Sequence, residues 1–355
     1  MKKIKILFLL IFTIYSSFNN AQTDKENSNK ATILAQNFLK EQKVPGMSIS
    51  VSKKGELIWS KGFGFVDIKT KKKINPKTTQ FRIASISKTL TAVALAKLVD
   101  DKKLNFNASL FDYVPDFPKK EYDFSIRQLG GHLAGIRHYK GREFLMNKKM
   151  SIVEGLDIFK NSKLLFKPQT KFKYSTYSFN LLSVVIQNAS KENYFEYMRK
   201  NIFEPLKMFN TVLDVSNKKN ANRTKFYVKR KDEIIEGPLV NNEFKAAGGG
   251  FLSTSEDLVL FGNEFLKPVV ISKTSLKELI TPQKTIDGKS TKYGIGVSVS
   301  KINNIRKYSH SGGGIGATSY LLIYPEKEIV ISILTNLSRV KMRVFIKNLE
   351  TIFIE

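Results

Sequence analysis

The stretch FRIASISK, residues 81–88, decides the fold of this 355-residue chain. An apolar entry leads to Ser85, and Lys88 follows three residues later. Apolar residues then recur as far as Asp100, which predicts a long and largely buried helix over residues 85–100. Positions i and i+3 lie on the same face of a helix, so we expect the Lys88 amine within reach of the Ser85 hydroxyl.

The pair of Ser85 and Lys88 suits nucleophilic catalysis. A serine at a helix start lies near the positive end of the helix dipole, which favours alkoxide character. A desolvated lysine loses proton affinity and can then act as a base. The same spacing also fits an ordinary helix cap at Ser85, so on spacing alone both interpretations stay open.

A tyrosine motif offers a second group for proton transfer. Tyr174 lies in FKYST, residues 172–176, just before an apolar helical run at residues 181–186. Its hydroxyl is a candidate to share the proton relay with Lys88. By itself such a tyrosine is more often packed in the core than catalytic.

A glycine run offers backbone amides that could stabilise an oxyanion. HSGGG, residues 310–314, ends a predicted strand, and its glycines let a substrate approach the backbone closely. The amide of Gly313, paired with that of Ser85, is predicted to form an oxyanion hole. The alternative is a simple glycine-rich turn.

Strand patterns gather near the two ends of the chain. Met47, Ile49 and Val51 alternate with serines as in a half-buried strand, and residues 57–65 return as a second strand. Further strands are predicted at 293–299, 305–309, 318–324 and 329–334, before a final helix at about 338–354. Helical stretches and loops fill residues 105–285. The pattern predicts an α/β (α+β) fold, with an antiparallel sheet from both termini flanked by helices and a mostly helical lobe inserted between.

The first residues are typical of an export signal. Residues 1–21 combine a basic start, an apolar run too short to span a bilayer and an exit at Ala21, as in a signal peptide. Residues 22–31 are predicted to be a flexible leader, and residues 32–355 the functional domain. Since the chain has no cysteine, we expect an exported protein of a bacterial periplasm, without stable membrane insertion after signal removal.

Composition excludes several other classes of site. The formal net charge is +28, but the lysines are scattered and no basic-and-aromatic platform for nucleic acid is evident. None of the three histidines has the spacing of a zinc site, and no cofactor is expected. Neither a G-x-S-x-G elbow nor a phosphate-binding P-loop occurs.

Taken together, the motifs at Ser85, Tyr174 and His310 resemble those of the class C β-lactamase and D-alanyl-D-alanine carboxypeptidase family. The resemblance extends from about residue 30 to the C-terminus and is carried also by landmarks such as HLAGI at residues 132–136. Within the family it is similar to the mitochondrial serine β-lactamase-like proteins of animals. It implies a β-lactamase/transpeptidase-like fold and, as possible partners, a small-molecule or peptide substrate and further copies in a homo-oligomer or filament.

The resemblance also implies that four residues bind substrate: Thr176, His310, Ser311 and Gly312. Thr176 stands where many members have asparagine, and His310 where they have lysine. A fixed positive charge for a substrate carboxylate is therefore lost or made pH-dependent. Both departures argue against efficient antibiotic hydrolysis.

The hypothesis that follows is a serine hydrolase that acts on amide or ester bonds through an acyl-enzyme, with D-amino-acid peptides or β-lactams as substrate types. The catalytic residues are then Ser85, Lys88 and Tyr174. Two alternatives stay open: a non-catalytic polymerising or cell-wall-binding scaffold, and a penicillin-binding protein with negligible turnover.

Overall fold

The computed structural model describes the backbone of residues 2–216 and 218–355, and the side chains of this part from Gln22 onward. The chain divides into two compact units, one made of its two ends and one of residues 44–340. Each unit is considered by itself.

The unit of the two ends consists of two helices, α1 (Lys2–Glu41) and α9 (Arg343–Phe353). The rings of Phe38 and Phe345 stack with their centroids 4.3 Å apart. The predicted final helix is present but begins at Arg343 rather than near residue 338.

The flexible leader predicted at residues 22–31 is helical and belongs to α1. No glycine or proline interrupts the chain before Pro45, and Glu26 pairs with Lys30 one turn later at 2.7 Å, so the helix propagates despite its polar sequence. The predicted signal peptide concerns residues 1–21, whose side chains lie outside the described residues, and it stays a prediction.

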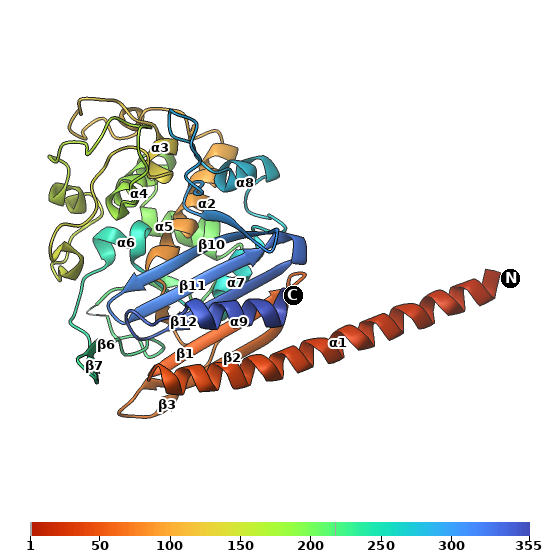
Figure 1. The fold of residues 1–355 in the computed structure, drawn as a ribbon. Coiled ribbons are helices and arrows are strands. Elements are labelled where there is room, and N and C mark those ends of the chain that lie inside the picture. The colour runs from red at the N-terminus through yellow and green to blue at the C-terminus, as the bar shows by residue number, and fades with distance from the viewer. Residues whose placement is uncertain (1, 217) are drawn as a thin grey trace. The chain divides into compact units, whose positions relative to one another are not determined.

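The predicted antiparallel sheet is confirmed in the second unit. Within the described residues it has seven strands in the order β3-β2-β1-β12-β11-β10-β9, so that strands from both ends of the sequence meet at the pair β1–β12 (Figure 1). Its strands are β1 (Gly46–Lys53), β2 (Glu56–Asp67), β3 (Lys72–Lys73), β9 (Ser298–Ile302), β10 (Ile305–Gly314), β11 (Ala317–Tyr324) and β12 (Ile329–Thr335).

Strand β1 is buried on both faces, whereas its alternating pattern predicted a half-buried strand. The hydroxyls of Ser48 and Ser50 hydrogen-bond to Ser255 of helix α7 at 2.7 and 2.8 Å, and Ser52 donates to Asn263 at 2.9 Å. Because each serine has a polar partner, the polar face of the strand can be buried as well.

The strand predicted at residues 293–299 begins only at Ser298. Gly296 adopts a φ of +71°, which ends any extended run there. A side chain at this position would lie 2.8 Å from the Lys88 carbonyl, so the chain bends where it passes α2.

The predicted helical lobe contains most of the remaining elements. Its helices, with α2 that precedes it, are α2 (Ser87–Asp100), α3 (Ile126–Gly130), α4 (Thr176–Ser190), α5 (Tyr194–Met198), α6 (Ala246–Gly249), α7 (Ser255–Asn263) and α8 (Lys273–Ile280). Single turns are η1 (Ala84–Ile86), η2 (Leu110–Asp112), η3 (Glu143–Leu145), η4 (Glu154–Ile158), η5 (Arg199–Phe203), η6 (Glu243–Lys245) and η7 (Pro325–Lys327). Short strands form two small sheets: β4 (Phe81–Arg82), β5 (Val212–Leu213) and β8 (Phe251–Ser253), and β6 (Tyr227–Arg230) with β7 (Glu233–Glu236).

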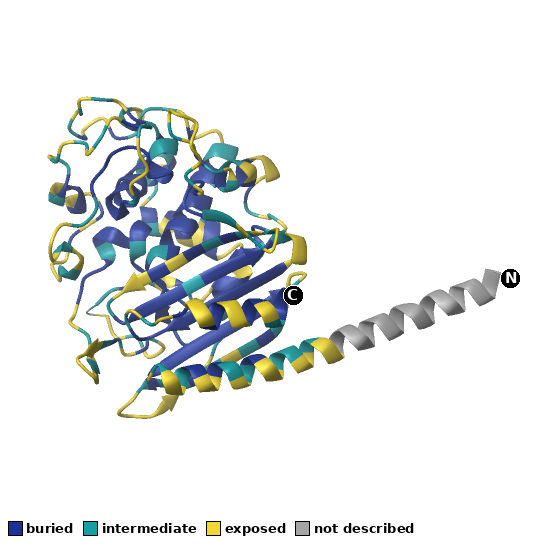
Figure 2. Cartoon of the chain, viewed as in Figure 1, coloured by how far each residue is buried: buried dark blue, intermediate teal, exposed yellow. Residues whose placement is uncertain are grey.

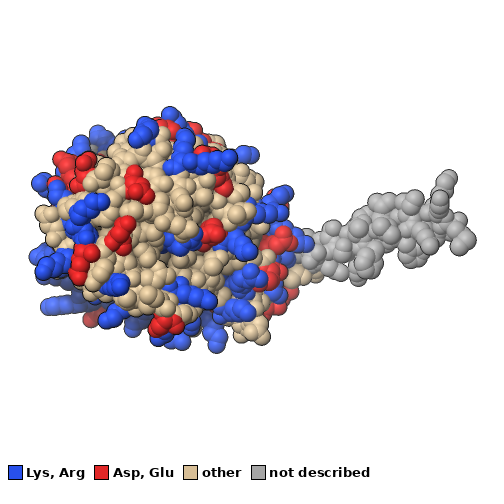
Figure 3. Space-filling view, turned by 90° about the horizontal axis from the view of Figure 1, so that it is seen from above, with Lys and Arg blue, Asp and Glu red and all other residues tan. Residues whose placement is uncertain are grey.

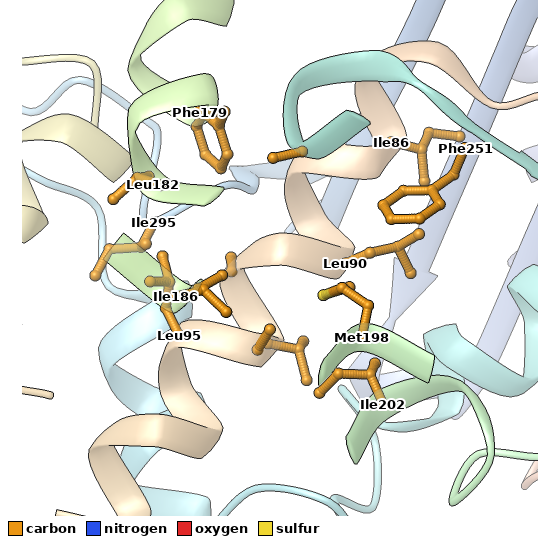
Figure 4. Close-up of a cluster of buried hydrophobic side chains, with 14 of the residues drawn as sticks. Ile86, Leu90, Leu95, Phe179, Leu182, Ile186, Met198, Ile202, Phe251 and Ile295 are labelled. Carbon is orange, nitrogen blue, oxygen red and sulfur yellow. The ribbon is translucent and has the colours of Figure 1, made fainter. Parts of the chain in front are cut away.

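Helix α2 lies in the centre of the hydrophobic core. Almost every residue from Ser87 to Leu98 is buried (Figure 2). In Figure 4, Leu90 and Leu95 of α2 lie among side chains of α4, η5 and β8, such as Ile186 and Phe251. A helix packed on all sides is held rigidly, so the residues at its N-terminal end have a fixed position.

Candidate active site

Ser85 lies in a strained turn. The predicted helix start at Ser85 is displaced by two residues: the turn η1 holds Ser85, and α2 begins at Ser87. Ala84 has a φ of +45°, a region that residues with a side chain rarely adopt. Such strain persists only where the surroundings hold it, and it is typical of functional sites.

Strands β10 and β11 hold this turn in place. The Ser319 hydroxyl donates to the Ile83 carbonyl at 2.8 Å. A Cβ at Gly312 would lie 2.2 Å from that hydroxyl and 2.3 Å from the carbonyl oxygen of Ile83. Gly312 is therefore required where β10 crosses the turn, because any side chain would push the strand away from Ser85.

Lys88 lies behind Ser85 and is fully buried, with an exposed fraction of 0%. Its Nζ is 3.2 Å from Ser85 Oγ, 3.2 Å from Thr176 Oγ1 and 2.5 Å from the Gly248 carbonyl oxygen. Among the described residues, no carboxylate pairs with it. Burial therefore lowers the pKa of Lys88 well below its usual value, which is what a general base requires.

Tyr174 lies against the same pair. Its ring centroid is 4.9 Å from Lys88 Nζ, and Tyr174 and Ser85 line the same cavity. Burial raises the pKa of Tyr174, so the phenol keeps its proton at neutral pH. Of the two predicted bases, Lys88 is therefore the better proton acceptor, and Tyr174 is placed to relay a proton.

Two histidines fix the backbone that follows Tyr174. The amide of Ser175 donates to Nδ1 of His132 at 3.2 Å, and the amide of Thr176 donates to Nδ1 of His138 at 3.1 Å. These ring nitrogens must be unprotonated, and burial, aided by the nearby Lys88, lowers the pKa of both histidines, that of His138 to about 4. His132 also contacts the Tyr174 ring at a centroid distance of 4.3 Å, so it positions the tyrosine.

A cavity of about 380 Å³ opens in front of Ser85. Four of the predicted site residues line it, namely Ser85, Tyr174, Thr176 and Gly313. Gly313 has no neighbour within 4 Å of a hypothetical Cβ, so its backbone faces open space. Ser85 and Gly313 therefore border one cavity, and the oxyanion hole predicted for their amides stays a prediction.

The three other predicted substrate residues do not line the cavity. Ser311 is exposed elsewhere, and Gly312 is buried against the turn. His310 is buried: the Tyr293 hydroxyl lies 2.9 Å from Nε2, and Nδ1 lies 2.7 Å from the Ser311 carbonyl oxygen. Burial and the nearby Lys88 lower the pKa of His310 to about 3, so the ring supplies no positive charge at neutral pH.

Sequence reasoning missed the wall of the cavity that carries charge. It is lined by Arg82, Asn242 and Lys245, with Asp214 bound to Arg82 at 2.6 Å. Arg82 belongs to the stretch 81–88, and Lys245 lies three residues before the glycine run 248–250. Neither position has a spacing that distinguishes it from the many other basic residues of the chain.

The described residues show no metal site and no membrane span. No group of three or more histidine, aspartate or glutamate side chains among them is arranged to hold a metal ion. Among the residues from Gln22 onward, whose side chains are described, no helical segment is both long and apolar enough to cross a bilayer. On the face drawn in Figure 3, basic side chains are interspersed with acidic ones rather than gathered in one patch.

Known proteins resemble this chain in sequence and in fold. The serine beta-lactamase-like protein LACTB, mitochondrial, of Homo sapiens is 31% identical over 406 aligned positions, which cover 83% of this chain and 74% of the human protein. A solved class C beta-lactamase superposes with a TM-score of 0.79 at 18% identity, covering 94% of this chain and 97% of that one. A D-stereospecific amidohydrolase from Streptomyces superposes with a TM-score of 0.76 at 19% identity, covering 89% and 97%.

At such identities the two solved structures establish the fold alone. The family model described as Beta-lactamase matches residues 33–348, which is most of the sequence. The chain belongs to the beta-lactamase family.

Proposed function

We propose that this protein is a serine hydrolase that cleaves amide or ester bonds through an acyl-enzyme. The observation that carries the proposal is the contact of 3.2 Å between Ser85 Oγ and the amine of Lys88, which is buried without a carboxylate. A neutral amine at hydrogen-bond distance can take the hydroxyl proton as the oxygen attacks.

The residues divide the reaction between them. Lys88 accepts the proton of Ser85, and Ser85 Oγ forms a bond to the substrate carbonyl carbon. The amides of Ser85 and Gly313 hold the negative oxygen of the tetrahedral intermediate. The intermediate collapses as Tyr174 passes a proton from Lys88 to the leaving group, and water then releases the acyl group by the reverse sequence.

D-amino-acid peptides and β-lactams are the substrate types that we propose. A D-stereospecific amidohydrolase and a class C beta-lactamase share the fold, which supports both types without choosing between them. Thr176, where many family members have asparagine, binds Lys88 in this chain, and His310 is neutral. Both features favour peptide or ester substrates over efficient antibiotic turnover.

Export to a bacterial periplasm is the location that we propose. It rests on residues 1–21 and on the absence of cysteine from the sequence. The human relative is mitochondrial by name, so the mitochondrion is the alternative location. Assembly into a homo-oligomer or filament also stays a prediction.

Covalent labelling tests the proposed nucleophile. The mature protein is incubated with a fluorophosphonate probe and with a fluorescent penicillin, and the labelled peptide is identified by mass spectrometry. We expect label on Ser85 and none on Ser85→Ala. Equal labelling of the variant contradicts the proposal, and folded protein that takes no label favours the scaffold alternative. A burst of label followed by negligible turnover identifies a penicillin-binding protein instead.

A further inference from the structure

We propose that Lys245 binds a carboxylate of the substrate inside the cavity that Ser85 lines. The inference rests on the proposed function, since it names a feature of the molecule that the same site acts on. It is carried by the charge of the cavity and by the partners of its cations.

The cavity wall is positively charged. Arg82 and Lys245 line it, and none of the described lining residues is an aspartate or glutamate. His138 also lines it, but its Nδ1 accepts the Thr176 amide, so the ring is not a cation at neutral pH. A concave site with cations and no carboxylate on its surface concentrates anions.

Lys245 is the cation of this wall that lacks a partner of opposite charge. Its side chain is buried, with the whole residue only 5% exposed. Nζ donates one hydrogen bond, 2.9 Å long, to the Phe144 carbonyl, and the rings of Tyr139 and Phe244 lie 5.7 and 5.4 Å away. Within the described part of the chain it forms no ion pair. A buried ammonium in this state is costly, and an anion in the cavity relieves that cost.

Arg82, by contrast, is already neutralised. Its Nε donates to Asp214 Oδ2 at 2.6 Å, and its Nη1 donates to the Ile315 carbonyl at 2.9 Å. The same Asp214 oxygen accepts from Asn242 at 2.6 Å, and Arg223 approaches the other oxygen at 3.5 Å. The carboxylate is thus occupied by three donors, which leaves the charge of Lys245 for a ligand.

A single available ammonium favours a singly charged group. A carboxylate needs one cation, whereas a phosphate dianion is usually held by several donors and charges. The neutral His310 cannot supply the cation from the other side of the site. Lys245 therefore supplies the positive charge that His310 of strand β10 does not provide.

Matched pairs of chromogenic esters test this assignment. The first pair differs on the acyl side, the p-nitrophenyl monoester of adipic acid against its carboxamide analogue. The second differs on the leaving-group side, 4-acetoxybenzoate against 4-acetoxybenzamide. For each pair the ratio of kcat/KM, anionic over neutral, is measured in the wild type and in Lys245→Met, Lys245→Arg and Lys140→Met.

We expect the ratio of at least one pair to fall roughly 10- to 100-fold in Lys245→Met, which corresponds to the loss of a charged hydrogen bond. Lys245→Arg should keep most of the preference because it keeps the charge. Lys140→Met removes the same charge from an exposed position nearby and should change the ratio less than about threefold. A ratio that is the same in Lys245→Met and wild type for both pairs overturns the assignment.

A binding measurement separates this proposal from the proposed reaction. Titration with free adipamic acid, followed by NMR, reports the anion site whether or not esters are cleaved. Loss of this binding in Lys245→Met with no hydrolysis in the wild type leaves the anion site standing and removes the serine hydrolase. If the wild type hydrolyses esters but binds adipamic acid no better than Lys245→Met does, the serine hydrolase stands and the anion site is removed.

Discussion

Two buried lysines near Ser85 have different surroundings, and we propose opposite roles for them. Lys88 is fully enclosed and contacts two hydroxyls and a carbonyl, with no carboxylate among its described neighbours. Lys245 borders the open cavity and lies in the field of Asp214, which raises its pKa while burial and Arg82 lower it. Burial takes the pKa of Lys245 only to about 8, whereas that of Lys88 falls well below the usual range.

Burial alone does not decide whether a lysine is a neutral amine or a cation. Complete desolvation without a counter-charge favours the neutral amine and produces a base. At Lys245 the desolvation is less complete and Asp214 acts from nearby without forming an ion pair, so the ammonium is kept at neutral pH and attracts anions. The fold thus places a buried amine behind Ser85 and an ammonium in the wall of the cavity that Ser85 lines.

The largest effect is expected from removing the base. Lys88→Met should lower the rate of acylation of Ser85 by about 10²- to 10⁴-fold, because the hydroxyl loses its proton acceptor. The rate is measured by stopped-time labelling with the fluorophosphonate probe. Lys97→Met, at the other lysine of α2, is the matched control and should label at the wild-type rate. Lys88→Met that labels as fast as this control contradicts the role of the amine.

A smaller but substantial effect is expected from removing Asp214, the counter-charge of Arg82 in the cavity wall. Asp214 is fully buried and neutralises Arg82, so Asp214→Ala leaves a buried guanidinium unpaired. The free energy of unfolding should fall by about 3–5 kcal/mol, measured by urea denaturation. Asp116→Ala, which changes an exposed aspartate, should stay within about 0.5 kcal/mol of the wild type. If the two variants are equally stable, Asp214 is not the counter-charge that distinguishes Arg82 from Lys245.

The smallest effect concerns the pH dependence of the two lysines. Lys245 is protonated below a pKa of about 8 and loses its charge as the pH rises through that value. The preference for the anionic ester over its neutral analogue should therefore be present at pH 6–7 and fall several-fold by pH 9–10. Burial lowers the pKa of Lys88 well below that of an ordinary lysine, and rising pH favours its neutral form, so hydrolysis of the neutral ester should not fall with the preference. A ratio of kcat/KM that is flat or rising across pH 8, or one that still falls in Lys245→Met, is inconsistent with the assignment.

Much of the fold was predictable because it depends on local pattern. Alternating strands at both ends of the sequence, with helices between them, predicted the antiparallel sheet that pairs β1 with β12. The errors arose where tertiary contacts decide. Gly296 interrupts the strand predicted at residues 293–299 because the chain must bend past Lys88, and the serines of β1 are buried because α7 supplies hydrogen-bond partners.

The contact of Ser85 with Lys88 was predictable from their spacing, whereas Tyr174, Thr176 and Gly313 were predicted from motifs and from the family resemblance. Ser85 and Lys88 are three residues apart, and one turn of chain suffices to bring them into contact. The place of Gly312 was not predictable in this way: it contacts Ile83 and Ser319, and only the crossing of β10 over the turn shows why it must be glycine.

The family, the order of the three motifs and the pairing of Ser85 with Lys88 follow from the sequence alone, since these depend on residue type and short spacing. The tertiary structure decided the charges. Whether Lys88, His310 or Lys245 carries a proton depends on burial and on which carboxylate lies near, and Asp214, which matters most to Arg82, is 132 residues away from it in the chain. Electrostatic energy depends on the distance between charges and on their burial, and both are set by the tertiary structure rather than by the order of the residues.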